Sequence, residues 1–212
     1  MLMPTVPTPF PLRWGFTTRL DSPELAPPPR LRQIHSAEIH RATSELQPGD
    51  GLWTTDRGMA IGVRVADCVP VLLAGNTPNG PWIAALHAGW RGAVAGILRR
   101  GVALFESQGG APRALSWALG PGIRQCHFEV GAEVVEAARR DPAWASELAE
   151  PRPNGKFHFD LHGFLQYQAQ DLGLDPAKDG SVLRCTLCER EQLYSYRGGD
   201  LEGRQWGWIE IL

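Results

Sequence analysis

Apolar and β-branched residues gather in short runs along the chain, and most of these runs are bounded by glycine, proline or polar residues. Runs of this length and composition predict strands. They occupy residues 14–18, 31–34, 60–66, 69–74, 82–86, 115–119, 182–184 and 206–211. Pro70 lies just inside one run, which predicts an edge position or a bulge there, because proline cannot donate to a strand ladder.

One longer segment carries the helical period instead. Its apolar positions recur every three or four residues, at Val94, Ile97, Leu98, Val102 and Phe105. This spacing predicts an amphipathic helix over residues 93–108. Gly109-Gly110 follows directly and supplies the stop.

Two further helices complete the pattern. One is predicted over residues 130–140, and another begins from an N-cap at Asp160 and runs to Leu172, with Gly173 at its C-terminal end. Strands and helices do not alternate strictly along the chain, so a doubly wound parallel sheet is disfavoured. We predict an α+β fold, a single layered domain over residues 1–212 with a mixed β-sheet core and flanking helices.

The composition is that of a globular protein: 43% of the 212 residues are hydrophobic and 21% are charged. The net charge of −2 and the scattered arginines lack the basic stripe that nucleic acids require, so no nucleic-acid partner is expected. The first residues lack the pattern of a secretory signal, and no apolar run is long enough to cross a bilayer. We therefore expect a cytoplasmic protein without membrane contact, whose four cysteines are free thiols or ligands.

Three side chains able to bind a soft metal or act as nucleophiles lie at the ends of predicted strands. His35 follows Ile34, Cys68 separates two of the apolar runs, and His87 ends a third run just before Gly89. Strand ends on one side of a sheet bring such side chains to the mouth of a site. The pattern therefore predicts one shared centre built from His35, Cys68 and His87.

A thiolate and two imidazoles form a ligand set that suits Zn²⁺ and leaves a fourth tetrahedral position open. The helix predicted to begin after Arg91 adds free backbone N–H groups and a positive dipole end, which with the Arg91 guanidinium predict a phosphate site. The residues alone leave structural alternatives open. Each histidine can be hydrogen-bonded to backbone, and Cys68 can be a small core residue.

A competing metal cluster can be drawn from the second half of the chain. His158 and His162 are four residues apart, and Cys185 and Cys188 form a Cys-x-x-Cys pair. With Asp160 as N-cap, however, His158 lies outside the helix and His162 lies in its first turn, so the two need not share a face. We favour core thiols for this cysteine pair.

Cys126 and His127 are adjacent in the sequence. Neighbouring side chains on an extended backbone point to opposite sides. The two residues are therefore predicted to be unrelated.

Five motifs follow one another in a fixed order along the chain. They are Gln33-Ile34-His35-Ser36-Ala37, Ala66-Asp67-Cys68-Val69-Pro70-Val71, His87-Ala88-Gly89-Trp90-Arg91-Gly92, Gly120-Pro121-Gly122-Ile123, and Cys185-Thr186 with Tyr194-Ser195-Tyr196-Arg197. In this order they resemble the signatures of the laccase-domain family, once named multicopper polyphenol oxidoreductases. The resemblance runs from Phe16 to Arg204. It implies zinc-dependent phosphorolysis of adenosine, inosine, guanosine and methylthioadenosine, with adenosine deamination.

Carried over by motif, the resemblance implies that His35, Cys68 and His87 are both the zinc ligands and the catalytic residues. It implies that phosphate attacks the anomeric carbon of the ribose while Arg91 and Arg19 hold it, and that water on zinc attacks the purine in deamination. The expected partners are a small-molecule nucleoside and phosphate. The sequence sets no oligomeric state.

Two departures from the family pattern bear on the substrate. The segment 20–32 is shorter than is usual in the family, where this stretch helps to line the pocket. Gly198 stands where a second arginine is expected after Arg197.

Three rival functions are compared with this reading. A copper oxidase is disfavoured, because six dispersed histidines do not supply a trinuclear cluster. A cysteine hydrolase or amidase acting on peptidoglycan precursors would use Cys68 as nucleophile, activated by His87 or His35. A non-catalytic metal-binding module would hold the ion for structure alone.

Overall fold

The central element of the structure is a five-stranded mixed sheet with the strand order β3-β5-β8-β7-β9. The computed structural model describes residues 1–212. The hairpin β7–β8 forms the middle of the sheet, β5 and β9 flank it as antiparallel neighbours, and β3 runs parallel to β5. The strands are β3 (Ile39–Arg41), β5 (Gly51–Thr54), β7 (Val69–Thr77), β8 (Gly80–Ala88) and β9 (Ser116–Leu119).

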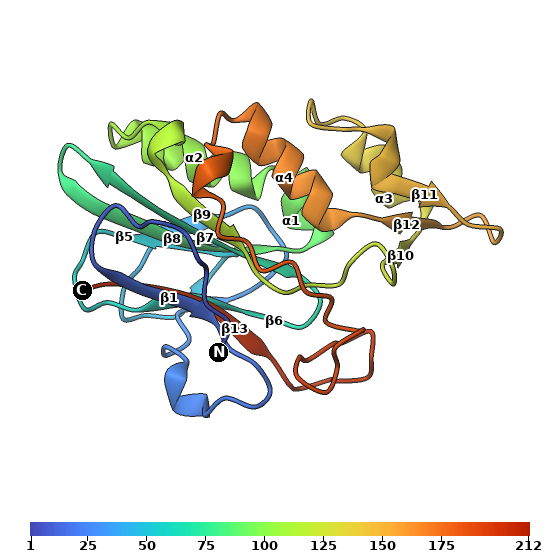
Figure 1. Cartoon of the computed structure of the whole chain (residues 1–212), viewed down its shortest axis with the longest axis horizontal. Coiled ribbons are helices and arrows are strands. Elements are labelled where there is room, and N and C mark those ends of the chain that lie inside the picture. Colours follow the sequence, from blue (N-terminus) through green and yellow to red (C-terminus); the bar gives the residue numbers. More distant parts are fainter.

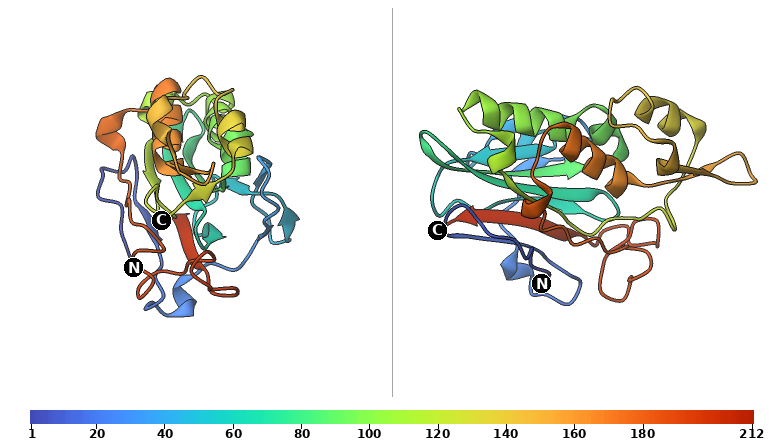
Figure 2. Two further views of the ribbon diagram at one scale, coloured as in Figure 1. Left: turned by 90° about the vertical axis from the view of Figure 1, so that its right-hand side faces the viewer. Right: turned by 45° about the horizontal axis from the view of Figure 1, so that its top comes forward.

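Each face of this sheet is covered by another layer (Figure 1). On one face lies an antiparallel sheet of order β1-β13-β6, made of β1 (Leu12–Phe16), β13 (Gln205–Ile211) and β6 (Ile61–Val65). The other face carries the helices, which Figure 2 shows gathered on one side. They are α1 (Trp90–Val94), α2 (Ile97–Ser107), α3 (Ala132–Ala138) and α4 (Leu161–Asp171). None of these helices has the length and apolar content that spanning a membrane requires.

Two small sheets extend the layers at the periphery. One has the order β10-β12-β11, with β10 (Glu129–Val130), β12 (Phe157–Phe159) and β11 (Ala149–Pro151). The other pairs β2 (Leu31–Arg32) in parallel with β4 (Gln47–Pro48). Short 3₁₀ turns occur at Pro23–Leu25, Pro112–Ala114, Ser146–Leu148 and Pro176–Lys178.

The central hairpin is apolar on both faces because both faces are buried. Along β7, Val71 and Leu73 point into the core beneath the helices, whereas Leu72 and Ala74 point into the core between the two sheets. The first core has 30 buried residues and the second has 14. This explains why the runs read as continuous rather than alternating, and the mixed-sheet α+β prediction is confirmed.

The predicted helix over residues 93–108 is in fact two helices. Gly96 adopts a left-handed backbone (φ 80°) between α1 and α2, and it ends the first helix and begins the second. Helical spacing of apolar residues cannot reveal such a break, because the side chains on either side still face the same core. The N-cap predicted at Asp160 is confirmed: its carboxylate accepts from the backbone N–H of Gly163 at 3.0 Å.

Two strand predictions were wrong. Pro70 lies in β7, an interior strand, and pairs with His87 in an unbroken register, so it is neither at an edge nor in a bulge. Its carbonyl accepts from Gly120 N just beyond the end of β9, so its ring nitrogen also faces the place where that ladder stops. Residues 182–184 form no strand, although Val182 N donates to the carbonyl of Leu119.

A buried carboxylate ties the helical layer together. Asp141 accepts from Arg99 Nη2 at 2.6 Å, from Gln168 Nε2 at 2.8 Å and from Ala143 N at 2.9 Å. Burial alone would raise the pKa of Asp141, but these donors, Arg99 foremost, hold it below its usual value. The folded state therefore favours the ionised carboxyl.

We predict that Asp141→Asn lowers the free energy of unfolding by about 1–3 kcal/mol near neutral pH, because it weakens charge-assisted hydrogen bonds. A depressed folded pKa stabilises the protein above the pKa of a free carboxyl, about 4, and this contribution is lost as the pH falls through the folded pKa. The difference between wild type and variant should therefore shrink in acid, as measured by urea denaturation across pH. Asp171→Asn is the matched control: Asp171 also binds Arg99 but its side chain is 41% exposed, and we expect a change below about 1 kcal/mol. Equal effects of the two variants would contradict this.

Candidate functional site

The pairing of β7 with β8 places Cys68 beside His87. Val69 lies opposite Ala88 and Pro70 lies opposite His87 in the antiparallel register. Cys68 immediately precedes β7, so it lies next to the point where β8 ends. Two residues 19 positions apart in the sequence are thus neighbours through the hairpin alone.

His35 reaches the same place from the loop between β2 and β3. Its backbone is left-handed (φ 59°), which is uncommon for a residue with a side chain. The N–H groups of Ile34, His35 and Ser36 all donate to the carboxylate of Asp50, at 3.2, 3.0 and 2.6 Å. These bonds hold the strained turn in place.

Asp50 connects that loop to His87. Its fully buried carboxylate also accepts from His87 Nδ1 at 2.7 Å and from the Ser36 hydroxyl at 2.8 Å. Burial would raise the pKa of Asp50, but the bonds from His87 and Ser36 lower it to about 2. Because Nδ1 of His87 is used by Asp50, Nε2 is the ring nitrogen left to face Cys68 and His35.

The three predicted residues therefore converge. One ligand atom from each of His35, Cys68 and His87 lies within 4.8 Å of the others, and the two imidazole rings meet edge to face at 4.9 Å between centroids. Gly89 makes room for them, since a Cβ at that position would lie 2.9 Å from the Cys68 sulfur.

The thiol and the imidazole change each other's protonation. Burial would raise the pKa of Cys68, but the positive charge of His87 and a hydrogen bond from His35 lower it to about 6. Burial would lower the pKa of His87, but the Cys68 charge and the Asp50 hydrogen bond raise it to about 9. Cys68 is therefore a thiolate near neutral pH.

The three residues line a pocket of about 710 Å³. This volume is in the range of small-molecule sites. Four arginines also line it: Arg32, Arg64, Arg197 and Arg204. Aromatic surface comes from Phe128 and Tyr196.

The two arginines predicted to bind phosphate lie elsewhere. Arg19 pairs with Asp200 at 2.6 Å and lies over the ring of Tyr194, and Arg91 is exposed with its guanidinium over Trp90. Neither lines the pocket. Their predicted role in phosphate binding stays a prediction.

Asp67 fastens the far wall of the pocket. It is the second non-glycine residue with positive φ (94°), and its carboxylate accepts from Thr186 Oγ1 at 2.6 Å, Ser195 Oγ at 2.7 Å and Arg197 N at 2.7 Å. Its carbonyl accepts from Ile123 N at 2.8 Å. One residue beside Cys68 thus holds two distant loops against the site.

The competing cluster with His158 and His162 does not form. His162 is buried and its Nε2 lies 3.0 Å from the carbonyl of Gly120, because the first turn of α4 points it under β9. The cysteine pair instead meets Cys126 and His127. The prediction that these two adjacent residues are unrelated was wrong, because their backbone is a turn and not extended.

Residues 20–212 match the family described as multi-copper polyphenol oxidoreductase laccase. The chain belongs to this family. It is 34% identical over 185 residues to "Purine nucleoside phosphorylase YfiH" of Shigella flexneri. The aligned region covers 86% of this chain and 73% of the relative. It is 32% identical over 166 residues to "Adenosine deaminase RL5" of an unknown prokaryotic organism, covering 78% of this chain and 63% of the relative. The solved structure of YlmD from Geobacillus stearothermophilus superposes with a TM-score of 0.76 at 28% identity, over 86% of this chain and 73% of that one.

In this member of the laccase family, the sequence pattern did not predict Asp50, the residue that organises the site. Asp50 lies between Gly49 and Gly51, after Pro48, and this composition is typical of a surface turn. No local signal separates a turn aspartate from a buried one with five hydrogen-bond donors.

We predict that Asp50→Asn lowers the free energy of unfolding by about 3–5 kcal/mol, since it breaks a buried charged pair with His87 and turns an amide toward backbone donors. Urea denaturation followed by circular dichroism measures the change. Ser36→Ala removes a single donor to the same carboxylate and should cost about 1 kcal/mol. An Asp50 variant no less stable than the Ser36 variant would contradict it.

Proposed function

We propose that this protein is a zinc-dependent purine nucleoside phosphorylase that acts on adenosine, inosine, guanosine and methylthioadenosine and also deaminates adenosine. The observation that carries the proposal is the convergence of His35, Cys68 and His87 in a pocket rich in arginine. The relatives named purine nucleoside phosphorylase and adenosine deaminase support the two reactions.

The residues present fit zinc. One sulfur and two imidazole nitrogens lie within 4.8 Å of one another, which a single tetrahedral ion can span, and three protein ligands leave one position for water or substrate. Asp50 supplies the carboxylate that commonly orients a zinc-binding histidine. Zinc bound here would supply a Lewis acid and lower the pKa of a water molecule to about 7.

The chain's own groups prepare the site for that ion. Asp50 accepts a hydrogen bond from Nδ1 of His87, so Nε2 is the ring nitrogen that would give up its proton and bind the ion. The low pKa of Cys68 makes the thiolate available without strong base. The hydrogen bonds from the His35 loop to Asp50 hold His35, the third metal-binding side chain, in place before the ion binds.

Phosphate binding falls to the arginines that line the pocket. Arg32 and Arg64 line the pocket, and their guanidinium groups make no hydrogen bond or ion pair within the chain, although that of Arg64 lies over the ring of Trp206. Arg197 and Arg204 instead donate to backbone carbonyls. An unpaired guanidinium is free to bind a phosphate through two parallel hydrogen bonds. We propose that Arg32 and Arg64 orient the phosphate oxygen that forms the new bond to C1′ as the bond from C1′ to the purine breaks.

The purine would lie against the aromatic wall. Phe128 and Tyr196 come from the two loops held by Asp67, and both line the pocket. Flat apolar rings suit the faces of a purine. Because such stacking tolerates different substituents, it accommodates several purine nucleosides.

Two other functions use the same residues. The thiolate of Cys68 beside a protonated His87 is the pair that a cysteine hydrolase needs, and this keeps the amidase acting on peptidoglycan precursors as the second candidate. A non-catalytic metal-binding module has less support, because three ligands facing a pocket leave a coordination position that a structural site normally fills.

To test the reaction, zinc-loaded protein is incubated with adenosine, with and without phosphate, and the products are separated by chromatography. We expect adenine and ribose 1-phosphate only in the reactions that contain phosphate. Deamination of adenosine to inosine uses water, so we expect it to proceed in the absence of phosphate. Chelation removes the ion and Cys68→Ser removes one of its ligands. Each should therefore reduce the rates of phosphorolysis and of deamination by more than about 100-fold. Metal-free protein that stays active until Cys68 is alkylated would contradict the zinc mechanism and support Cys68 as a nucleophile.

We predict that Arg64→Ala raises the KM for phosphate by more than about tenfold, with little change in the KM for nucleoside, because one charged hydrogen-bonding group is lost. Initial rates at varied phosphate measure this. Arg100→Ala, an exposed arginine on α2 outside the pocket, is the control. A phosphate KM raised by Arg91→Ala and unchanged by Arg64→Ala would return the role to the arginine expected from the sequence.

A further inference from the structure

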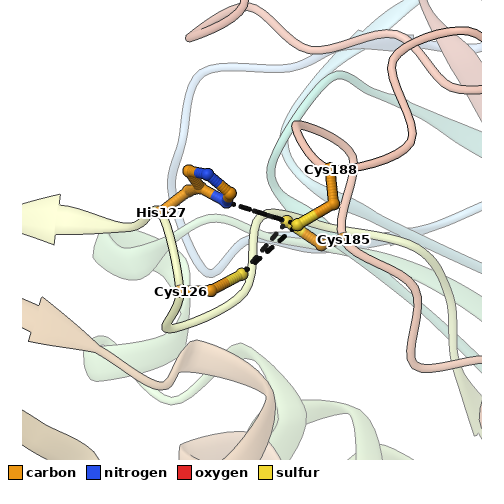
Figure 3. Close-up of side chains that lie close together, drawn as sticks. All are labelled: Cys126, His127, Cys185 and Cys188. Carbon is orange, nitrogen blue, oxygen red and sulfur yellow. Dashed lines mark hydrogen bonds between the residues drawn. The ribbon is translucent and has the colours of Figure 1, made fainter.

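A second group of soft ligands lies outside the candidate active site. Cys126 and His127 project from the loop after β9, and Cys185 and Cys188 project from the loop after α4 (Figure 3). One ligand atom from each lies within 4.8 Å of all the others. We propose that these four residues form a second, structural zinc site.

The distances match the edges of a zinc tetrahedron. Zinc bonds of about 2.3 Å to sulfur and about 2.0 Å to nitrogen place two sulfurs about 3.8 Å apart and a sulfur and a nitrogen about 3.5 Å apart. The sulfur of Cys126 lies 3.6 Å from those of Cys185 and Cys188. His127 Nδ1 lies 3.8 Å from the Cys185 sulfur and 3.4 Å from the Cys188 sulfur. The three cysteines of the cluster are not in disulfides, in which two sulfurs would be about 2 Å apart.

Two turns and one backbone bridge produce this geometry. The N–H groups of His127 and Phe128 both donate to the carbonyl of Arg124, and this curl directs adjacent side chains toward one point. Gly122 and Cys185 form a parallel bridge that joins the two loops beside the cluster.

The donor set distinguishes this centre from the first one. Three thiolates and one imidazole complete a tetrahedron and leave no position for water, which is the composition of structural zinc sites. The spacing of Cys185 and Cys188 is the Cys-x-x-Cys of such sites. Three of the four residues are exposed, so the ion would lie near the surface and not in a reaction pocket.

The consequence is a clamp on the pocket wall. Phe128, which follows His127 directly, lines the pocket on one loop, and Tyr196 and Arg197 line it on the other. Arg197 already crosses between the loops by donating to the carbonyl of Glu129 at 3.2 Å. A zinc ion shared by the two loops would hold both walls at a fixed separation.

The test counts metal in the full-length protein purified without chelator, by elemental mass spectrometry and native mass spectrometry. Cys188→Ser should lose about one zinc per chain relative to its parent. Made in a Cys68→Ser background, the same change should again remove about one zinc, so the result does not depend on the first site. Unchanged zinc content in both backgrounds would overturn the proposal, as would a different metal at the site.

A second measurement needs no variant and so does not depend on folding. Cys126 and Cys188 are exposed, so as free thiols they would be alkylated at the same rate with and without a chelator. We expect both to resist alkylation until a chelator is added, and trypsin cleavage after Arg124 and Arg190 to rise with chelation. Immediate alkylation of untreated protein, or a disulfide between these cysteines, would overturn the zinc site.

Discussion

The carboxylate of Asp50 is the interaction on which the candidate active site depends. It is fully buried, and its charge is compensated only by hydrogen bonds from the His35 loop and from His87. A buried charge is tolerated only when such donors surround it. The same bonds therefore stabilise the fold and orient two of the three predicted ligands.

Around that carboxylate, backbone geometry does the rest. The hairpin register delivers Cys68 beside His87, and Gly89 leaves the space that the thiol occupies. Both non-glycine residues with positive φ, His35 and Asp67, lie at this site. Strained backbone of this kind persists where surrounding hydrogen bonds hold it in place. The carboxylate of Asp50 accepts the bonds that hold the His35 turn, and the carboxylate of Asp67 accepts three bonds from the neighbouring loop.

The pocket wall opposite the hairpin has no regular secondary structure of its own to hold it. Its two loops are joined from the inside by the carboxylate of Asp67, which binds Thr186, Ser195 and Arg197. On the outside, the side chains of Cys126 and His127 from one loop meet those of Cys185 and Cys188 from the other. If both connections operate, the wall is fixed from two sides by groups that take no part in chemistry.

The sequence by itself determined the layers, the helix cap at Asp160 and the trio of His35, Cys68 and His87, because apolar period and local motifs are properties of neighbouring residues. Tertiary structure decided what depends on distant partners. Asp50 has the composition of an ordinary turn, Arg32 and Arg64 carry no local sign of facing a pocket, and Cys126 and His127 converge only because a turn replaces extended backbone. The physical reason is that burial and ligand geometry arise when separate segments meet, and no short stretch of sequence contains that meeting.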